Sequence, residues 1–234
     1  MNKLTYFILL LSSIYFNCTQ PKRTDNRMKD QKLTYLALGD SYTIGEGVEE
    51  AGRYPNQTVE LLKSFGLNFE KPTIIAKTGW TTDELNAGIN NAGIEHKTFD
   101  LVTLLIGVNN QYRGRSIENY QEEFEDLLNQ AIRFADGDAS HVAVISIPDW
   151  GVTPFALDKG SNQQKVKQEI DLFNKVNGEI SKKMGVHYIH ITERYREVGF
   201  LPEMVVEDKL HPSHLIYEEW AIELAKIIEK KMQF

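Results

Sequence analysis

Short apolar runs alternate with longer segments of helical period from Leu33 to the end of the chain. The apolar runs are nearly continuous and rich in β-forming residues, which is typical of strands that are covered on both faces. We predict five such strands, at residues 34–38, 73–76, 101–106, 141–146 and 186–191.

The longer segments have the spacing of amphipathic helices. Between residues 117 and 131, apolar side chains recur every three or four positions and glutamates fill the other face. Ser116 is placed to cap this helix. Helices are predicted near residues 56–65, 83–92, 117–135, 164–184 and 213–231. Strands and helices that alternate in this way predict an α/β fold, a three-layer α/β/α sandwich with a parallel sheet in the middle.

Composition limits the number of domains and the partners that the protein can bind. The chain has 234 residues, of which 41% are hydrophobic and 25% charged, and this suits one globular domain. The formal net charge is −7, and without residues 1–32 it is −11, because 20 Lys and Arg remain against 31 Asp and Glu. Such an acidic surface lacks the charge that nucleic acid binding needs, so a nucleic acid partner is excluded.

The first residues read as an export signal. A basic start at Lys3 is followed by a mostly apolar stretch over residues 4–16 and then by Cys18, the single cysteine. This is the outline of a secretory signal, and the stretch is too short for a membrane-spanning helix. One cysteine also excludes an intramolecular disulfide and a multi-cysteine metal site.

The position of Cys18 resembles that of the lipidated cysteine in a bacterial lipoprotein signal. The resemblance implies a protein exported from a bacterial cytoplasm and anchored to a membrane by a lipid on Cys18. The usual signal has leucine and small residues before the cysteine, whereas this chain has Tyr15, Phe16 and Asn17. The alternative is an ordinary periplasmic or secreted protein. The expected organisation is a signal at residues 1–18, a polar tether at 19–32 and one domain at 33–234.

Residues that could carry chemistry follow the predicted strands. Gly39-Asp40-Ser41 ends the first strand, Gly79 follows the second, and Asn109 follows the third. The carboxyl ends of parallel strands form the edge where ligands bind. Each residue alone has an ordinary explanation as a turn or capping residue, and Asp40 is better explained as structural than as catalytic.

A histidine and an aspartate near the C-terminus could activate the serine as a nucleophile. Asp208 and His211 are three residues apart, so the carboxylate can hold one imidazole nitrogen while the other faces Ser41. The backbone N–H groups of Ser41 and Gly79 and the amide of Asn109 could then stabilise an oxyanion. His214 is a lesser rival for the base, since it has no aspartate three residues before it.

This set resembles the SGNH hydrolases, also called GDSL-type esterases and lipases. Their four blocks supply serine, glycine, asparagine and histidine, and Ser41, Gly79, Asn109 and His211 match them in order. The resemblance implies a flavodoxin-like sheet with strand order 2-1-3-4-5, and ester hydrolysis through an acyl-enzyme with Ser41, His211 and Asp208 as the triad. It implies no metal or organic cofactor. The chain also has no dinucleotide or Walker motif.

Two positions depart from the family's blocks. Tyr42 stands where the family name has leucine, at a variable position, and Asn110 stands where the third block has aspartate. The competing α/β-hydrolase fold is disfavoured, because its Gly-x-Ser-x-Gly elbow is missing around Ser41.

The substrate is left open by the sequence. The family resemblance implies esters of short acyl groups, lysophospholipids or acetylated carbohydrates, and export favours glycans or lipids. Trp80, Asn110, Tyr112 and Trp150 follow the strands and are predicted as candidate substrate contacts, with loop packing as the alternative. The rival function is a non-catalytic surface module that binds carbohydrate or lipid on the same fold.

Overall fold

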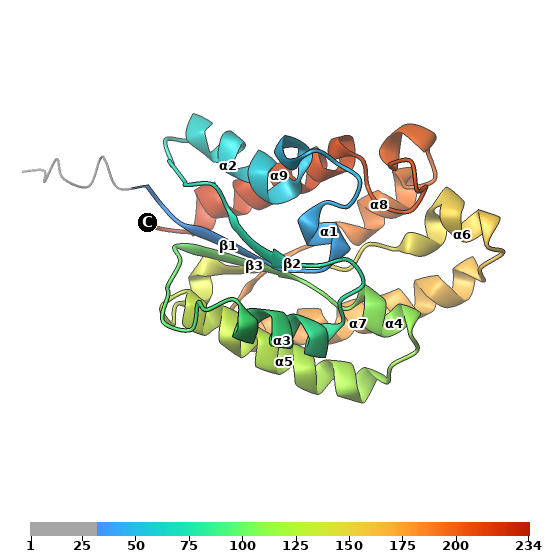
Figure 1. Cartoon of the computed structure of the whole chain (residues 1–234), viewed down its shortest axis with the longest axis horizontal. Coiled ribbons are helices and arrows are strands. Elements are labelled where there is room, and N and C mark those ends of the chain that lie inside the picture. The colour runs from blue at the N-terminus through green and yellow to red at the C-terminus, as the bar shows by residue number, and fades with distance from the viewer. Residues whose placement is uncertain (1–31) are drawn as a thin grey trace, which may run out of the picture. The chain divides into compact units, whose positions relative to one another are not determined.

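The five predicted strands all form, and they pair in parallel in the order β2-β1-β3-β4-β5 (Figure 1). The computed structural model describes residues 32–234, so the predicted signal, Cys18 and the predicted tether up to residue 31 lie outside the described residues. The predicted fold class and strand order are confirmed. The strands are β1 (Tyr35–Gly39), β2 (Thr73–Ala76), β3 (Leu101–Leu105), β4 (Val142–Ile145) and β5 (His187–Ile189).

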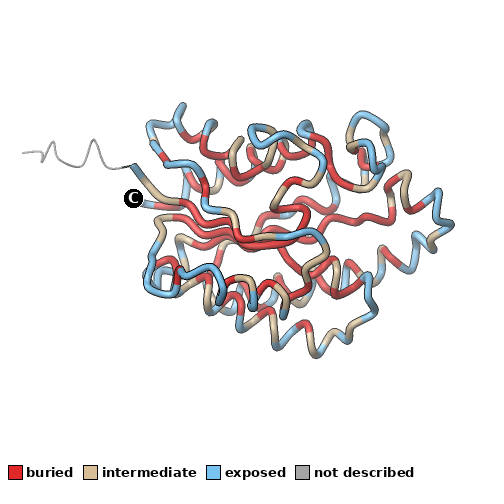
Figure 2. Tube along the Cα trace, in the orientation of Figure 1, coloured by how far each residue is buried: buried red, intermediate tan, exposed pale blue. Residues whose placement is uncertain are grey.

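The centre of the sheet is the centre of the hydrophobic core. Every residue of β1, β3 and β4 is buried, whereas the edge strands β2 and β5 are partly exposed. Figure 2 shows this buried band running between the two layers of helices. Continuous apolar runs therefore mark strands that are covered on both faces.

The five predicted helices form the two outer layers. Helices α2 (Tyr54–Ser64) and α9 (His214–Lys231) pack together on one face of the sheet, and α3 (Thr82–Asn91), α5 (Ile117–Phe134) and α7 (Gln163–Lys183) cover the other (Figure 1). The predicted cap is confirmed, because Ser116 Oγ accepts a hydrogen bond of 3.2 Å from Asn119 N.

Four short α-helices follow strand ends and were not predicted. They are α1 (Ser41–Ile44), α4 (Val108–Tyr112), α6 (Pro154–Asp158) and α8 (Thr192–Val198). Each spans two turns or fewer, too short for an apolar period to show in the sequence. Single turns of 3₁₀-helix are also present: η2 (Glu50–Gly52), η3 (Ala139–His141), η4 (Trp150–Val152) and η5 (Pro202–Met204). Within residues 32–234, no helix is long and apolar enough to cross a membrane.

The close approach of β1 to its surroundings requires glycine at position 39. A Cβ atom there would overlap the Thr43 hydroxyl and the carbonyl oxygen of Leu105 on β3. The Leu105 oxygen belongs to a central strand and cannot move aside without disturbing the sheet. We therefore expect Gly39→Ala to lower the free energy of unfolding by at least ~1–3 kcal/mol, measured by urea denaturation.

The same substitution at Gly178 is the matched control. Gly178 lies inside α7, and a Cβ there would meet the Tyr188 ring at an ordinary 3.5 Å. Because glycine is unfavourable in a helix interior, Gly178→Ala should raise stability by ~0.5–1 kcal/mol. Equal stability of Gly39→Ala and the unmodified protein would contradict the packing described.

Candidate active site

Ser41 is the first residue of α1 and comes two positions after β1 ends at Gly39. Asp40 caps this helix, because its Oδ1 accepts a hydrogen bond of 3.0 Å from Tyr42 N. The strand and the cap together fix the direction of the Ser41 side chain. Ser41 is nearly buried and lines a cavity of about 200 Å³.

Gly79 reaches the same cavity from the end of β2. Its φ of +84° favours glycine, whereas space does not require it, since a Cβ would meet only Arg113 Nη2 at 3.6 Å. Arg113 Nη2 donates 2.6 Å to the Gly79 carbonyl, and Arg113 also pairs with Glu84 at 3.2 Å. Among the backbone hydrogen bonds of residues 32–234, the N–H groups of Ser41 and Gly79 have no carbonyl acceptor.

Asn109 also lines the cavity, from α4 after β3. Its side-chain amide donates 3.0 Å to the carbonyl of Trp80. An amide nitrogen carries two hydrogens, so one stays available to a ligand in the cavity. The structure therefore brings together the three oxyanion donors that the sequence analysis named.

Asn110 is not among the residues that line the cavity, so the structure gives no support to the prediction that it contacts substrate. It is fully buried, its Oδ1 accepts 3.1 Å from Thr82 N, and its Nδ2 donates 2.6 Å to Thr82 Oγ1. Thr82 Oγ1 in turn donates to Glu123. The Thr82 hydroxyl donates its hydrogen to Glu123, so it can only accept a hydrogen bond from residue 110. Asparagine can donate that hydrogen bond, whereas an ionised aspartate could not.

Trp80 likewise does not line the cavity. Its ring covers Gly88 of α3 so closely that a Cβ at Gly88 would overlap it. The prediction that Trp80 contacts substrate is therefore not supported, and its packing role explains the residue. Tyr112 and Trp150, by contrast, both line the cavity as expected.

His211 and Asp208 form the predicted pair. His211 Nδ1 lies 2.5 Å from Asp208 Oδ2, and Asp208 Oδ1 accepts 2.9 Å from His211 N and 2.8 Å from Leu210 N. Partial burial tends to raise the pKa of Asp208, but these hydrogen bonds outweigh it and hold the pKa below its usual value. The carboxylate therefore stays ionised at neutral pH and fixes the orientation of the imidazole.

Two tyrosines support this histidine loop. The Tyr42 ring lies 5.5 Å from the His211 ring and 6.3 Å from that of Trp220. Tyr195 OH donates 3.2 Å to the carbonyl of Leu210. Tyr42, discounted as a variable position in the sequence, thus packs directly against the candidate base.

Four of the predicted site residues line the same cavity. Ser41, Gly79, Asn109 and His211 all line it, and Asp208 holds His211 from outside. His214, the rival base, borders a separate hollow with Gly47 and Val205. Among the hydrogen bonds of the described residues, none joins Ser41 to His211, which is common for catalytic pairs without substrate.

Aromatic side chains form the other wall of the cavity. Tyr112 and Trp150 meet edge to face at 5.3 Å, and Trp150 meets Phe155 at 6.4 Å. Lys159 Nζ donates 3.0 Å to Tyr112 OH and lies 4.7 Å from the Phe155 ring. Lys159 and Arg113 were missed from the sequence, because neither stands in a motif and their partners are distant along the chain.

Other hollows in the structure hold none of the predicted site residues. A groove of about 610 Å³ runs between α7 and β5 and contains polar side chains such as Asn174 and Thr192. Within residues 32–234, no group of three or more His, Cys, Asp or Glu side chains is placed to hold a metal ion.

Comparisons with known proteins find a matching family and similar solved structures. Residues 37–219 match the GDSL-like Lipase/Acylhydrolase family. Among solved structures, the lipase/acylhydrolase from Enterococcus faecalis aligns with a TM-score of 0.67 and 18% identity, covering 86% of this chain and 97% of that one. TesA aligns with a TM-score of 0.65 and 18% identity, covering 86% of this chain and 99% of that one.

A third similar structure is Axe2, an acetylxylan esterase from Geobacillus stearothermophilus. It aligns with a TM-score of 0.62 and 19% identity, covering 86% of this chain and 94% of that one. At these identities the solved structures establish a shared fold. No curated protein sequence matches the chain.

Asp40 gives the site a buried carboxyl that is poorly solvated. Burial raises its pKa from 3.8 to about 7, and within the described residues its Oδ2 has no hydrogen-bond partner. From about pH 4 to 7 the unfolded chain ionises while the folded protein keeps the proton, so stability falls as pH rises. We expect Asp40→Asn to be more stable than the unmodified protein by up to ~4 kcal/mol at pH 8.

Urea denaturation at pH 4, 6 and 8 measures this difference. The stabilisation by Asp40→Asn should be smallest at pH 4 and grow toward pH 8. Asp126→Asn, which changes an exposed carboxyl on α5, is the control and should show no such trend. A stability difference for Asp40→Asn that does not vary with pH would contradict the raised pKa.

Proposed function

The chain belongs to the GDSL-like lipase/acylhydrolase family, and from this premise we propose that it hydrolyses carboxylic esters through an acyl-enzyme formed on Ser41. The observation that carries the proposal is the shared cavity of Ser41 and His211, with Asp208 hydrogen-bonded to the far nitrogen of His211. Family membership places the chain among carboxylic ester hydrolases. The non-catalytic binding module considered above has no observation in its favour.

The chemistry begins with a proton transfer. His211 Nε2 accepts the Ser41 hydroxyl proton as Oγ attacks the carbonyl carbon of the ester, and Asp208 stabilises the imidazolium. The imidazolium then protonates the departing alcohol, leaving Ser41 acylated. Water attacks the acyl group by the same route, with its proton passing to His211 and back to Ser41 as the acid leaves.

The negative charge that develops on the substrate oxygen is met by three donors. The backbone N–H groups of Ser41 and Gly79 and the amide of Asn109 all border the cavity. Removing one such donor typically raises the barrier by ~3 kcal/mol. Arg113 supports the Gly79 donor, because it holds the carbonyl of the same residue from behind.

The size of the cavity favours short acyl groups. Its volume of about 200 Å³ is below the ~300–1,000 Å³ of sites for larger ligands, and aromatic rings close one side. Among the substrates considered above, acetyl and other short esters fit this space better than long-chain lipids. A structurally similar protein is an acetylxylan esterase, which supports acetylated carbohydrate as a substrate class.

The proposed site of action is outside a bacterial cytoplasm. The basic start, the apolar stretch over residues 4–16 and Cys18 support export, followed by anchoring through a lipid on Cys18. An exported esterase would meet acetylated glycans and lipids at the cell surface.

Replacing the nucleophile tests the mechanism. Ser41→Ala should abolish labelling by a fluorophosphonate probe and lower kcat for p-nitrophenyl acetate by at least ~10⁴-fold. Asp208→Asn should lower kcat by a similar factor, because the imidazole loses the carboxylate that sets its tautomer. Ser64→Ala, at an exposed serine of α2, is the control and should keep both labelling and turnover. Undiminished ester turnover by Ser41→Ala would refute the mechanism.

The acyl-length profile tests the substrate proposal. For p-nitrophenyl esters, kcat/KM should fall at least ~10-fold from butyrate to octanoate, because the longer chain does not fit the cavity. Phe155→Ala removes one aromatic wall and should reduce this preference. An unmodified protein that prefers octanoate would show that the cavity does not limit the acyl group.

A further inference from the structure

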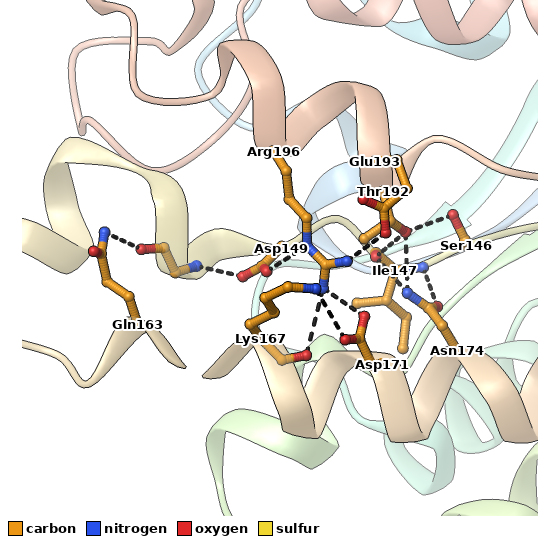
Figure 3. Close-up of polar contacts among 11 residues, drawn as sticks. Ser146, Ile147, Asp149, Gln163, Lys167, Asp171, Asn174, Thr192, Glu193 and Arg196 are labelled. Atoms are coloured by element: carbon orange, nitrogen blue, oxygen red, sulfur yellow. Dashed lines mark hydrogen bonds and ion pairs between the residues drawn. The ribbon is translucent and has the colours of Figure 1, made fainter. Parts of the chain in front are cut away.

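Arg196 on α8 is a buried cation held by three carboxylates. Its side chain is only 10% exposed, whereas each other Lys or Arg in an ion pair within the described residues is at least 29% exposed. The guanidinium lies 2.8 Å from Asp149, 2.6 Å from Asp171 and 2.5 Å from Glu193 (Figure 3). The N–H donors of a guanidinium point in fixed directions, so three carboxylate partners together fix the position of the Arg196 side chain.

Asp149 links this cation to the turn that follows β4. Its side chain is 2% exposed, its Oδ2 accepts from Arg196 Nε, and its Oδ1 accepts 2.9 Å from Gly151 N. Gln163 holds the other side of the turn by donating 2.7 Å to the Gly151 carbonyl (Figure 3). One carboxylate therefore ties α8 to the backbone on either side of Trp150.

The turn that Asp149 caps carries Trp150, and Trp150 lines the cavity. The residue is 6% exposed and lines the cavity, and its ring packs against Tyr112 and Phe155. Trp150 Nε1 donates 2.8 Å to Gln111 Oε1. The ring is thus held at its tip by Gln111 and at its backbone by the turn that Asp149 caps.

Tyr195, the residue before Arg196, contacts the loop that carries His211. Tyr195 OH donates to the carbonyl of Leu210, between Asp208 and His211. Phe155 N also donates 3.1 Å to the carbonyl of Lys209. Helix α8 therefore contacts both the turn that carries Trp150 and the loop that carries His211.

We propose that Arg196 is a positioning residue that acts through Asp149 to hold Trp150, and thereby sets which acyl groups the cavity accepts. This inference rests on the ester hydrolysis proposed above. Arg196 touches no cavity surface, so its effect on the reaction comes through the position of the tryptophan wall. The link is polar, buried and directional, so weakening it should change the wall before it changes Ser41 or His211.

The first test is the acyl-length preference of four variants. Arg196→Gln and Asp149→Asn each remove one partner of the Arg196–Asp149 ion pair. Arg196→Lys keeps the positive charge but loses the planar set of N–H donors. Arg194→Gln is the matched control, since Arg194 lies on the same helix, is 50% exposed and pairs with Glu219. Each variant is assayed with p-nitrophenyl acetate and octanoate below its thermal midpoint.

Arg196→Gln should lower the acetate-to-octanoate ratio of kcat/KM about tenfold, because the wall is free to move outward. Asp149→Asn should shift the ratio in the same direction, Arg196→Lys should shift it less, and Arg194→Gln should leave it unchanged. The double variant Arg196→Gln with Asp149→Asn should match the single ones, because both break one link. Equal loss of activity toward both esters in folded variants would overturn the proposal and leave Arg196 a purely structural residue.

Tryptophan fluorescence gives a second test that needs no turnover. Acrylamide quenching is measured for each variant with and without Trp150→Phe, and the difference isolates the signal of Trp150. That signal should become more quenchable and shift to the red in Arg196→Gln, and it should not change in Arg194→Gln. If the unmodified protein hydrolyses no ester, the proposed function fails and quenching alone decides this inference. If Arg196→Gln does not fold, Arg196→Lys and Asp149→Asn carry the same test, and an unchanged Trp150 signal in both refutes it.

Discussion

The register of β1 between its two neighbours is the constraint on which the site depends. Gly39 pairs with Ala76 on β2 and with Leu105 on β3, so these three strands end level with one another. The next few residues of each strand then share one edge of the sheet, which places Ser41, Gly79 and Asn109 around one cavity. The close contact at Gly39 makes this register specific, because a side chain there would separate β1 from β3.

Three buried or partly buried carboxyl groups around the site behave differently because their partners differ. Asp208 receives hydrogen bonds from an imidazole and two backbone N–H groups, which keep its pKa low. Asp149 lies 2.8 Å from the guanidinium of Arg196, and both side chains are almost fully buried. Asp40 accepts a hydrogen bond from Tyr42 N but pairs with no cation among residues 32–234, and burial raises its pKa to about 7. The pKa of Asp208 and that of Asp40 therefore move in opposite directions, because hydrogen bonds outweigh burial at Asp208 and burial outweighs hydrogen bonds at Asp40.

Most of the fold and the candidate catalytic residues could be named from the sequence because their patterns are local or periodic. The central strands are continuous apolar runs, and Asp208 and His211 lie three residues apart. The short helices could not be predicted, since one or two turns show no period. Trp80 and Asn110 follow predicted strands, as residues of a site would. In the structure, however, the Trp80 ring packs against Gly88 and the Asn110 side chain hydrogen-bonds Thr82. Arg196 gives no signal at all, because Asp149 lies 47 positions away in the chain.

The candidate reacting groups and the aromatic wall of the cavity are held mainly by different contacts. Ser41, Gly79 and Asn109 each lie within four residues of the end of a paired strand, so strand pairing places their backbones. Trp150, Tyr112 and Phe155 lie on short helical turns that polar contacts join to the rest of the domain. The side-chain contacts among these, which hold Trp150 and Tyr112, can be exchanged without altering strand pairing. Under the ester hydrolysis proposed above, the fold can thus keep one reaction while the aromatic wall changes to suit another acyl group.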